Sequence, residues 1–299
     1  MKIVIAGGSG FIGEPLARRL ADRADVVVLS RNPEQVKAGR GVEWNPGAGG
    51  AWEREIADAS AVINLAGENI GAGRWTAARK KRLVNSRIDS TGALVRAMQA
   101  WPDPSRRFIS ASAIGFYGAR GDEILDESSA GGVDFLANLA RDWESAAHRA
   151  DGAARVIILR LGIVLAADGG ALPKMVLPVR MFVGGPMGSG DQWMSWIDRD
   201  DLLRMIEWTL DRSDPQGVYN VTAPGPVRNR DFIRTLARVL QRPAFMPAPG
   251  FALKVVLGQM AGPLLLASER VVPANATAEG FTFAHPELGE ALQHVFRSR

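Results

Sequence analysis

The chain has 299 residues, 46% hydrophobic and 23% charged, a composition that predicts an ordinary globular protein of one or two domains. It contains no cysteine, which excludes disulfides, thiolate metal sites and a cysteine nucleophile. Its net charge of +4 suits a polyanionic small ligand, whereas the scattered basic residues, with few aromatics among them, disfavour nucleic acid. The three histidines, His148, His285 and His294, lack metal-ligand spacing, so no metal is expected.

The chain opens on an apolar run of strand character, followed by the loop GGSGFIG and an amphipathic helical segment. Gly7 permits a tight turn, Gly10 a close approach of backbone to a pyrophosphate, and Gly13 close packing of the helix on the strand. The unpaired N–H groups and the dipole of a helix N-terminus attract phosphate. This loop therefore predicts a dinucleotide site, which includes Phe11 and Ile12.

The end of the next predicted strand, residues 25–32, decides which dinucleotide binds. NAD enzymes usually carry Asp or Glu there to bind the ribose 2′-hydroxyl, but this chain has Ser30 and Arg31 and no acid before Glu34. Arg31 can neutralise a 2′-phosphate and stack on adenine, and Ser30 can donate a hydrogen bond. The alternative for Arg31 is a solvated surface arginine. We predict NADP(H).

A glycine- and proline-rich loop is expected over residues 40–50, followed by a short acidic stretch. The next apolar strand runs into Asn64, Leu65, Ala66 and Gly67. Strand ends form the ligand crevice of a doubly wound sheet, and small residues there let ribose and phosphates lie against backbone. Leu65, Ala66 and Gly67 are candidate cofactor contacts, whereas Asn64 has the alternative role of closing a turn.

A long helix is predicted over residues 76–100, with Thr76 as its N-cap. Positive charge is concentrated around its first half, at Arg74, Arg79, Lys80, Lys81, Arg82 and Arg87. Cations are unfavourable at a helix N-terminus, and a bound anion would relieve the conflict. One or two of these residues are therefore expected to face substrate or cofactor, and Arg87 is our candidate.

Residues 107–113 predict another core strand, which carries the hydroxyls of Ser110 and Ser112 and leads to Tyr117. Ser110 is a candidate cofactor contact. A helix is expected to begin near Asp134.

Residues 156–165 predict a buried strand whose single charge, Arg160, must find a partner, either structural or at the site. From residue 166 glycine, proline and methionine become frequent, which marks a substrate-side lobe. Residues 195–202 lead into a helix with acidic residues at its start, and residues 218–221 predict a late strand that returns to the sheet.

The remainder is predicted to be helical, with a short strand at residues 281–283. Residues 251–267 are apolar but interrupted by Lys254, Gln259 and a Gly-Pro pair. A membrane span needs about 20 mostly apolar residues, so this stretch predicts a buried helix pair.

We therefore predict an α/β fold: a Rossmann doubly wound parallel sheet in residues 1–165, which bind NADP(H), and a smaller C-terminal α/β substrate lobe in residues 166–299. The chain begins directly on a strand, without the pattern of a signal peptide. We expect a cytoplasmic monomer or homodimer that acts on a small molecule, without nucleic-acid or membrane partners.

Several of these motifs occur together and in the order found in one known family. They are Gly7-x-x-Gly10-x-x-Gly13, Asn64-Leu65-Ala66-Gly67, Arg74-Trp75 with Lys80 and Ser86-Arg87, Ser110-Ala111-Ser112-Ala113 before Tyr117-Gly118, Ser195-Trp196-Ile197, and Glu269-Arg270-Val271-Val272-Pro273 before Gly280-Phe281-Thr282-Phe283. As a set they resemble the extended or atypical short-chain dehydrogenase/reductases, and more narrowly the epimerase-family proteins that end in a domain of unknown function. The resemblance implies a Rossmann fold, bound NADP(H) and a C-terminal substrate lobe, but no particular substrate.

The chain departs from that superfamily at its proton-transfer dyad, Tyr-x-x-x-Lys, in which lysine lowers the pKa of tyrosine. Gly121 lies four residues beyond Tyr117, and Ala223 lies four beyond Tyr219, the only other tyrosine. The helix after the Ser112 strand, where the motif belongs, reads FLANLAR. The dyad is absent.

Three interpretations remain open. The first is an NADP(H)-dependent oxidoreductase or epimerase with a non-standard proton donor, and the second is a catalytically silent NADP(H) sensor or scaffold. The third is different chemistry on the same fold, such as a lyase.

For the first interpretation, Ser112 and Tyr117 are the candidate catalytic pair, and Lys80 or Arg87 would have to lower the Tyr117 pKa from its free value of about 10. The alternative is that both residues are structural.

Overall fold

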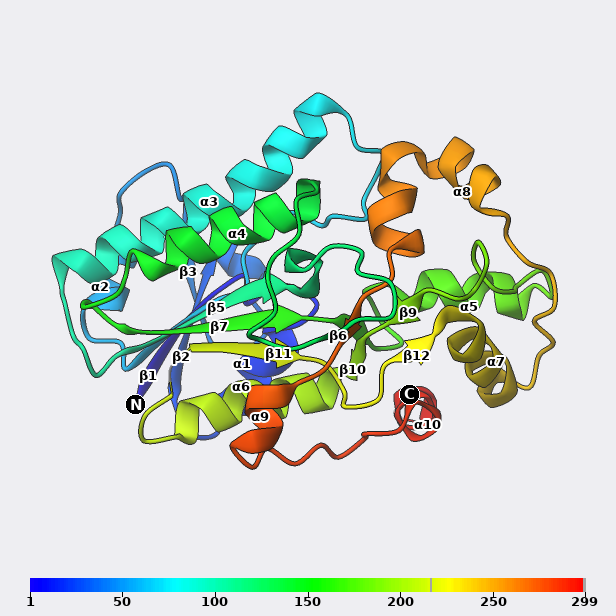
Figure 1. The fold of residues 1–299 in the computed structure, drawn as a ribbon. Helices are drawn as coiled ribbons and strands as arrows, with labels where there is room; N and C mark the ends of the chain where they lie inside the picture. Colours follow the sequence, from blue (N-terminus) through cyan, green and yellow to red (C-terminus); the bar gives the residue numbers. More distant parts are fainter. Residues whose placement is uncertain (216, 298–299) are drawn as a thin grey trace.

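A computed structural model describes residues 1–215 and 217–297. Within them, seven strands form one sheet in the order β11-β7-β5-β4-β1-β2-β3, and all neighbouring strands are parallel (Figure 1). The strands are β1 Lys2–Ala6, β2 Asp25–Ser30, β3 Arg40–Glu43, β4 Ala61–Asn64, β5 Arg107–Ala113, β7 Arg155–Leu161 and β11 Gly217–Val221. Strand order reverses between β1 and β4, as in a doubly wound sheet. The predicted fold class is confirmed.

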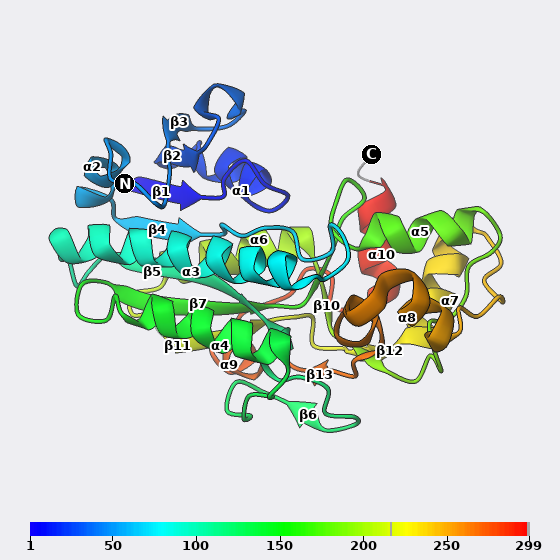
Figure 2. The same ribbon diagram turned by 90° about the horizontal axis from the view of Figure 1, so that it is seen from above.

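Helices cover both faces of the sheet, as Figures 1 and 2 show. One face carries α1 Gly13–Leu20, α6 Arg199–Asp211 and α9 Ala274–Ala278, and the other carries α2 Trp52–Ala57, α3 Ala77–Ala100 and α4 Phe135–His148. Alternate side chains of β1 serve the two cores: Ile3 and Ile5 pack with α1 and α6, and Val4 and Ala6 with α2 and α3. Burial on both faces explains why the strands are almost continuously apolar.

The C-terminal lobe lies beyond the carboxyl ends of the strands (Figure 2). Its helices are α5 Leu172–Arg180, α7 Asn229–Leu240, α8 Gly250–Leu257 and α10 Leu288–Arg297. Two short strand pairs link it to the sheet domain, β8 Ile163–Leu165 with β10 Trp196–Asp198 and β6 Ile124–Leu125 with β13 Arg270–Val271. A third pair, β9 Trp193–Met194 with β12 Val227–Arg228, lies within the lobe. The lobe has its own core, in which Leu172, Phe232 and Leu292 are fully buried. Its existence agrees with the predicted fold class, while a division after residue 165 stays a prediction.

Several local predictions are confirmed. The Thr76 hydroxyl accepts a hydrogen bond from the Arg79 backbone N–H at 3.1 Å and so caps α3. Asp134 caps α4 in the same way, accepting from the Ala137 N–H at 2.9 Å. The late strand β11 returns to the sheet beside β7, and α6 begins after Asp198, whose carboxylate accepts from the Asp200 N–H.

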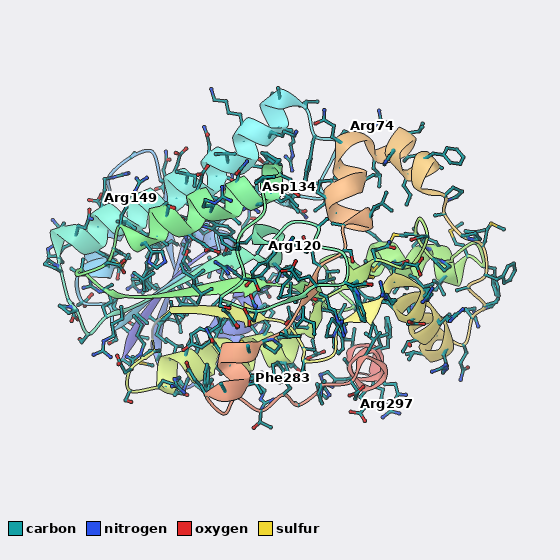
Figure 3. The ribbon with its side chains drawn as sticks, viewed as in Figure 1. Arg74, Arg120, Asp134, Arg149, Phe283 and Arg297 are labelled. Atoms are coloured by element: carbon teal, nitrogen blue, oxygen red, sulfur yellow. The ribbon has the colours of Figure 1, made fainter. Side chains whose placement is uncertain are left out.

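Two predictions of local structure are wrong. Residues 40–50 do not form a loop throughout, because β3 pairs with β2 at the sheet edge. Gly41 suggested a loop, but a Cβ there would lie 2.3 Å from the Pro33 carbonyl oxygen. Glycine is therefore needed in β3 where the turn Pro33–Gln35 packs against it. Residues 281–283 form no strand. Phe281 packs edge-on against Phe283, which is labelled in Figure 3, and against Trp208. These apolar residues therefore belong to an aromatic cluster.

The predicted buried helix pair over residues 251–267 is also wrong. Helix α8 has no buried residue, and Phe251, Val255 and Val256 are 74%, 72% and 62% exposed. It is followed by a 3₁₀ turn and a π-helical turn, Gly262–Leu266. Hydrophobic composition alone does not say which elements will cover a helix, so the prediction failed. No helix in residues 1–215 and 217–297 has the length and apolar character needed to cross a membrane.

Candidate functional site

The three predicted loop glycines have different surroundings. Gly7 has a φ of +82°, and a Cβ there would lie 2.8 Å from the Leu65 backbone. A Cβ at Gly13 would lie 2.2 Å from the Gly7 carbonyl oxygen, inside the contact between β1 and α1. At Gly10 a Cβ would meet only the Gly7 oxygen, at 3.2 Å. The first and third glycines therefore shape the turn, and the second leaves its mouth open.

A cavity of about 620 Å³ begins at this loop, crosses the carboxyl ends of the central strands and reaches the C-terminal lobe. It is lined by many predicted site residues: Gly7, Gly10, Phe11, Ile12, Gly13, Leu65, Ala66, Gly67, Arg87 and Ser112. Ser30, Arg31, Ser110 and Tyr117 are not among its lining residues. The structure thus brings ten of the fourteen predicted residues to one cavity.

The Ser30–Arg31 pair lies where β2 ends, beside β1 and the glycine loop. The Ser30 hydroxyl accepts a hydrogen bond from the Asn32 N–H at 3.1 Å. Arg31 is exposed and makes no hydrogen bond or ion pair within the part of the chain that the structure describes. Its guanidinium is therefore available to an anion at this strand end.

Arg87 is the one residue of the predicted basic group that lines the cavity, among the residues described. Its Nη1 donates to the carbonyls of Glu68 and Leu83, both at 3.2 Å, and its guanidinium lies over the Trp143 ring. Burial lowers the pKa of Arg87 to about 10, so it stays charged at neutral pH. A Cβ at Gly67 would lie 3.2 Å from its Cζ, which explains the small residue there.

Three of the other basic residues are held by protein groups. Arg79 pairs with Glu68. Arg74, which is labelled in Figure 3, donates to the carbonyls of Val255 and Val256 at the end of α8. Lys80 lies over the Phe135 ring, 4.9 Å from its centroid. Of the cations expected to face a ligand, Arg87 is therefore the one that remains a candidate among the residues described.

Ser112 and Tyr117 belong to one buried polar network. The Ser112 hydroxyl donates to the Glu144 carboxylate at 2.6 Å, and Arg160 donates to both oxygens of that carboxylate, at 2.9 and 2.8 Å. Arg160 also donates to the Tyr117 hydroxyl at 2.9 Å, and that hydroxyl donates to Asn220 at 2.7 Å. Arg160 thus finds a structural partner, as one of the two interpretations expected.

This network corrects the prediction that Lys80 or Arg87 is the cation beside Tyr117. Arg160 contacts the hydroxyl, whereas Lys80 and Arg87 are engaged elsewhere. The Tyr117 side chain is fully buried, and burial raises its pKa, outweighing the cation beside it. Ser110 is likewise buried, beside the Asn64 amide, and Asn64 closes its turn by accepting from the Ala66 N–H.

The helix that would carry the tyrosine–lysine dyad faces the cavity with apolar side chains. Leu136, Leu139, Ala140 and Trp143 of α4 all line it. A Cβ at Gly115 would lie 3.2 Å from the Cβ of Leu136, so this wall is close-packed.

Residues 3–222 match the model of the NAD dependent epimerase/dehydratase family, and residues 248–295 match a domain of unknown function, DUF1731. The chain belongs to the NAD dependent epimerase/dehydratase family. The resemblance drawn from the motifs is thereby confirmed. An epimerase family protein SDR39U1 homolog from Arabidopsis thaliana, described as chloroplastic, is 38% identical over 99% of this chain and 87% of its own length.

Two solved structures of the family are informative. Human epimerase family protein SDR39U1, crystallised with NADPH, is 33% identical, with a TM-score of 0.89 over all of both chains. The nucleoside-diphosphate sugar epimerase of Corynebacterium glutamicum is 32% identical, with a TM-score of 0.79 over 98% of this chain and 57% of that one. Both share the fold of this chain.

One titratable cavity residue, Glu269, was not among the predicted site residues. Glu269 lies just before β13 and lines the cavity at its lobe end. Burial, together with the negative charge of Asp134, raises the pKa of its carboxyl to about 8. The available signal was an acid after the apolar run 263–267, but sequence does not show that this run folds back over the strand ends.

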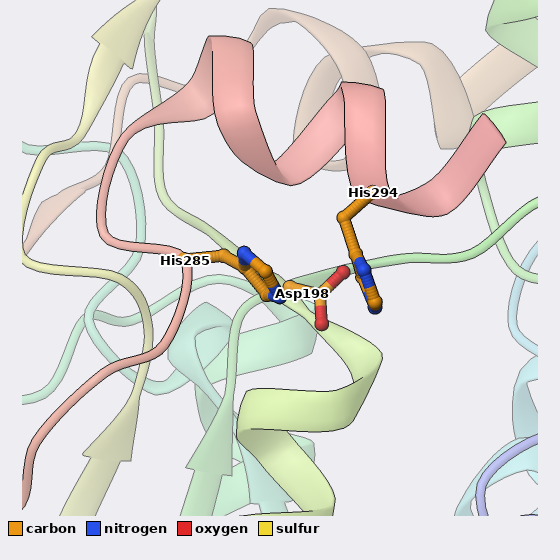
Figure 4. Close-up of side chains that lie close together, drawn as sticks. All are labelled: Asp198, His285 and His294. Carbon is orange, nitrogen blue, oxygen red and sulfur yellow. The ribbon is translucent and has the colours of Figure 1, made fainter. Parts of the chain in front are cut away.

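The structure also gathers Asp198, His285 and His294, whose candidate ligand atoms lie within 4.8 Å of one another (Figure 4). The imidazole rings are stacked, with centroids 4.1 Å apart and planes 21° from parallel. Ring lone pairs lie in these planes, so the two rings do not point at one ion. Asp198 caps α6 and His294 lies 2.8 Å from the Asp200 carboxylate, which is the geometry of a hydrogen-bonded cluster.

Proposed function

We propose that the chain binds NADP(H) in the large cavity and catalyses an oxidoreductase or epimerase-like reaction of a small molecule without the usual dyad. The open mouth of the glycine loop at Gly10, continuous with the cavity, carries this proposal. The backbone from Gly10 to Ile12 and the start of α1 would hold the pyrophosphate. When bound, the nicotinamide supplies hydride transfer.

The choice of NADP(H) rests on the end of β2. Arg31 is free to bind a 2′-phosphate there, and no carboxylate occupies the position that would favour the NAD ribose. The NADPH of the human relative agrees with this choice. Leu65, Ala66, Gly67 and Arg87 would border the remainder of the cofactor. Ser110 is buried, so it would not touch the cofactor and would instead support the strand end beside Asn64.

We assign Ser112 and Tyr117 structural roles in this proposal. Their hydroxyls satisfy the buried ion pair of Glu144 and Arg160, which would otherwise be left with unmet hydrogen bonds. A buried phenol with a raised pKa is a poor base at neutral pH.

A catalytically silent NADP(H) sensor or scaffold is the second candidate. The apolar face that α4 turns to the cavity favours it, because α4 lines the cavity with Leu136, Leu139 and Ala140 and contains neither tyrosine nor lysine. The Corynebacterium relative is described as an epimerase of nucleoside-diphosphate sugars, which keeps enzymatic function as our first choice.

Fluorescence titrations with NADPH and NADH test the cofactor, and NADPH oxidation in the presence of carbonyl compounds separates enzyme from sensor. Tight NADPH binding with turnover supports the first candidate, and tight binding without turnover supports the second. Equal affinity for both dinucleotides would contradict the assignment of Arg31.

The cytoplasmic location and the monomeric or homodimeric state stay predictions, to be checked by cell fractionation and light scattering.

A further inference from the structure

The polar side chains that line the cavity are nearly all engaged by protein groups. Arg87 donates to two carbonyls, and Glu68 pairs with Arg79. The Ser112 hydroxyl donates to Glu144 at 2.6 Å. These groups can border a ligand, but none has a proton free to give to it at neutral pH.

Glu269 differs from them. Its backbone is anchored, since its N–H donates to the Trp193 carbonyl at 3.3 Å and its carbonyl accepts from the Ser195 hydroxyl at 2.8 Å. Its carboxyl makes no hydrogen bond or ion pair with any residue that the structure describes, and it lines the cavity. An unpaired carboxylate between apolar walls is costly, and the cost is removed by holding a proton.

The surroundings of Glu269 favour its protonated form. Leu264, Leu265 and Ala267 line the same end of the cavity, and Asp134, at the start of α4 in Figure 3, adds a like charge. With a carboxyl pKa of about 8, Glu269 is mostly protonated at neutral pH and still loses its proton readily. A proton-transfer group works best when its pKa lies near the working pH.

We propose that Glu269 is the proton donor and acceptor of this site, acting on the oxygen of a small, mostly apolar carbonyl compound or of the corresponding alcohol. This inference rests on the proposed NADP(H)-dependent function. It assigns the missing dyad's work to the C-terminal domain of unknown function, because Glu269 lies within residues 248–295.

The proton balance is simple. During reduction the O–H bond of Glu269 breaks, a new O–H bond forms on the former carbonyl oxygen, and Glu269 is left as a carboxylate that solvent reprotonates through the cavity mouth. The carbonyl carbon receives the hydride assigned above to NADPH, so carbonyl is reduced to alcohol and NADPH is oxidised to NADP⁺. In the oxidative direction Glu269 accepts the proton of the alcohol.

The cavity walls indicate the substrate class. Its lobe end is formed by apolar side chains, among them Met187, Leu264 and Leu265. Arg87 is the only cation among the described lining residues, and two carbonyls already engage it. A second diphosphate, as in a nucleotide sugar, would lack cationic partners here.

Carboxyl NMR tests the protonation state without any turnover. The full chain is labelled with [δ-¹³C]glutamate, and the resonance absent from Glu269→Gln is assigned to Glu269. We expect it to titrate near pH 8, and to titrate at lower pH in Asp134→Asn, which keeps a capping side chain but removes the like charge. Glu287→Gln, an exposed glutamate, is the matched control and should change nothing. A Glu269 midpoint near pH 4 would overturn the proposal.

Kinetics test the role in catalysis. NADPH oxidation is followed with benzaldehydes and 1,2-diketones as probes. We expect Glu269→Gln to lower kcat about 10²–10⁴-fold with unchanged NADPH affinity. The wild-type rate of reduction should fall above about pH 8, and the residual rate of the variant should lack that fall. Wild-type turnover by Glu269→Gln would overturn the proposal. NADPH binding without reduction of any probe would instead contradict the proposed function, and the NMR titration would still decide the state of Glu269.

Discussion

Gly10 and Gly13 lie three residues apart in one loop, yet substitution should affect different properties of the protein. At Gly13 an added Cβ would meet backbone, 2.2 Å from the Gly7 oxygen and 2.6 Å from the Gly8 Cα. At Gly10 it would meet only the Gly7 oxygen, at 3.2 Å, and further atoms would enter the cavity. Gly13→Ala should therefore damage the fold, and Gly10→Val should damage dinucleotide binding.

The magnitudes follow from these contacts. Overpacking typically costs 1–3 kcal/mol, and replacing glycine by alanine in a helix returns roughly 0.5–1 kcal/mol. We expect Gly13→Ala to lose about 1–2 kcal/mol of unfolding free energy, which lowers Tm by a few degrees. For Gly10→Val the branched side chain takes the place of the pyrophosphate, and NADPH affinity should fall at least 100-fold, or about 2.7 kcal/mol.

Both variants are measured by thermal unfolding and by NADPH fluorescence titration. Gly10→Val should unfold within a few degrees of the wild type while failing to bind, and Gly13→Ala should show the larger loss of stability. Undiminished NADPH affinity in folded Gly10→Val would refute the placement of the pyrophosphate. An unchanged Tm for Gly13→Ala would refute the packing argument.

Arg31→Ala should weaken NADP(H) binding about 10–100-fold and barely change NAD(H) binding, because a charge-assisted hydrogen bond contributes roughly 1.5–3 kcal/mol; calorimetric titration that finds both affinities unchanged would exclude a role for Arg31. Tyr117→Phe should lower the unfolding free energy by about 1–3 kcal/mol, because it leaves groups of Arg160 and Asn220 buried without a partner; an unchanged urea midpoint would contradict this. Glu269 holds its proton in the folded state up to about pH 8 and loses it near pH 4 when unfolded, so wild-type stability should fall as pH rises through that window. Between pH 5.5 and 8 the wild type should lose roughly 1–3 kcal/mol more than Glu269→Gln, after discounting for solvent screening, and parallel pH profiles would disprove the raised pKa.

The local features of the nucleotide-binding half could be predicted because their causes are local. A strand buried on both faces is apolar throughout, a helix cap needs its hydroxyl or carboxylate two or three residues before the N–H that it serves, and a tight turn needs glycine. Residues 2–13, Thr76 and Asp134 therefore behave as their patterns indicated. The wrong predictions, at residues 40–50, 251–267 and 281–283, concern glycine, aliphatic and aromatic residues whose roles depend on distant neighbours.

The amino-acid sequence was sufficient for the fold class, the glycine loop and the absence of a Tyr-x-x-x-Lys motif, because each depends on residue types at short, regular spacing. Only the folded chain shows that Arg160 reaches Glu144 and Tyr117, and that Glu269 reaches the cavity. These residues lie on separate segments, and parallel strands with long crossovers bring such segments together at the carboxyl edge of a sheet. Side-chain protonation is decided there too, since burial and neighbouring charge exist only once the chain has packed.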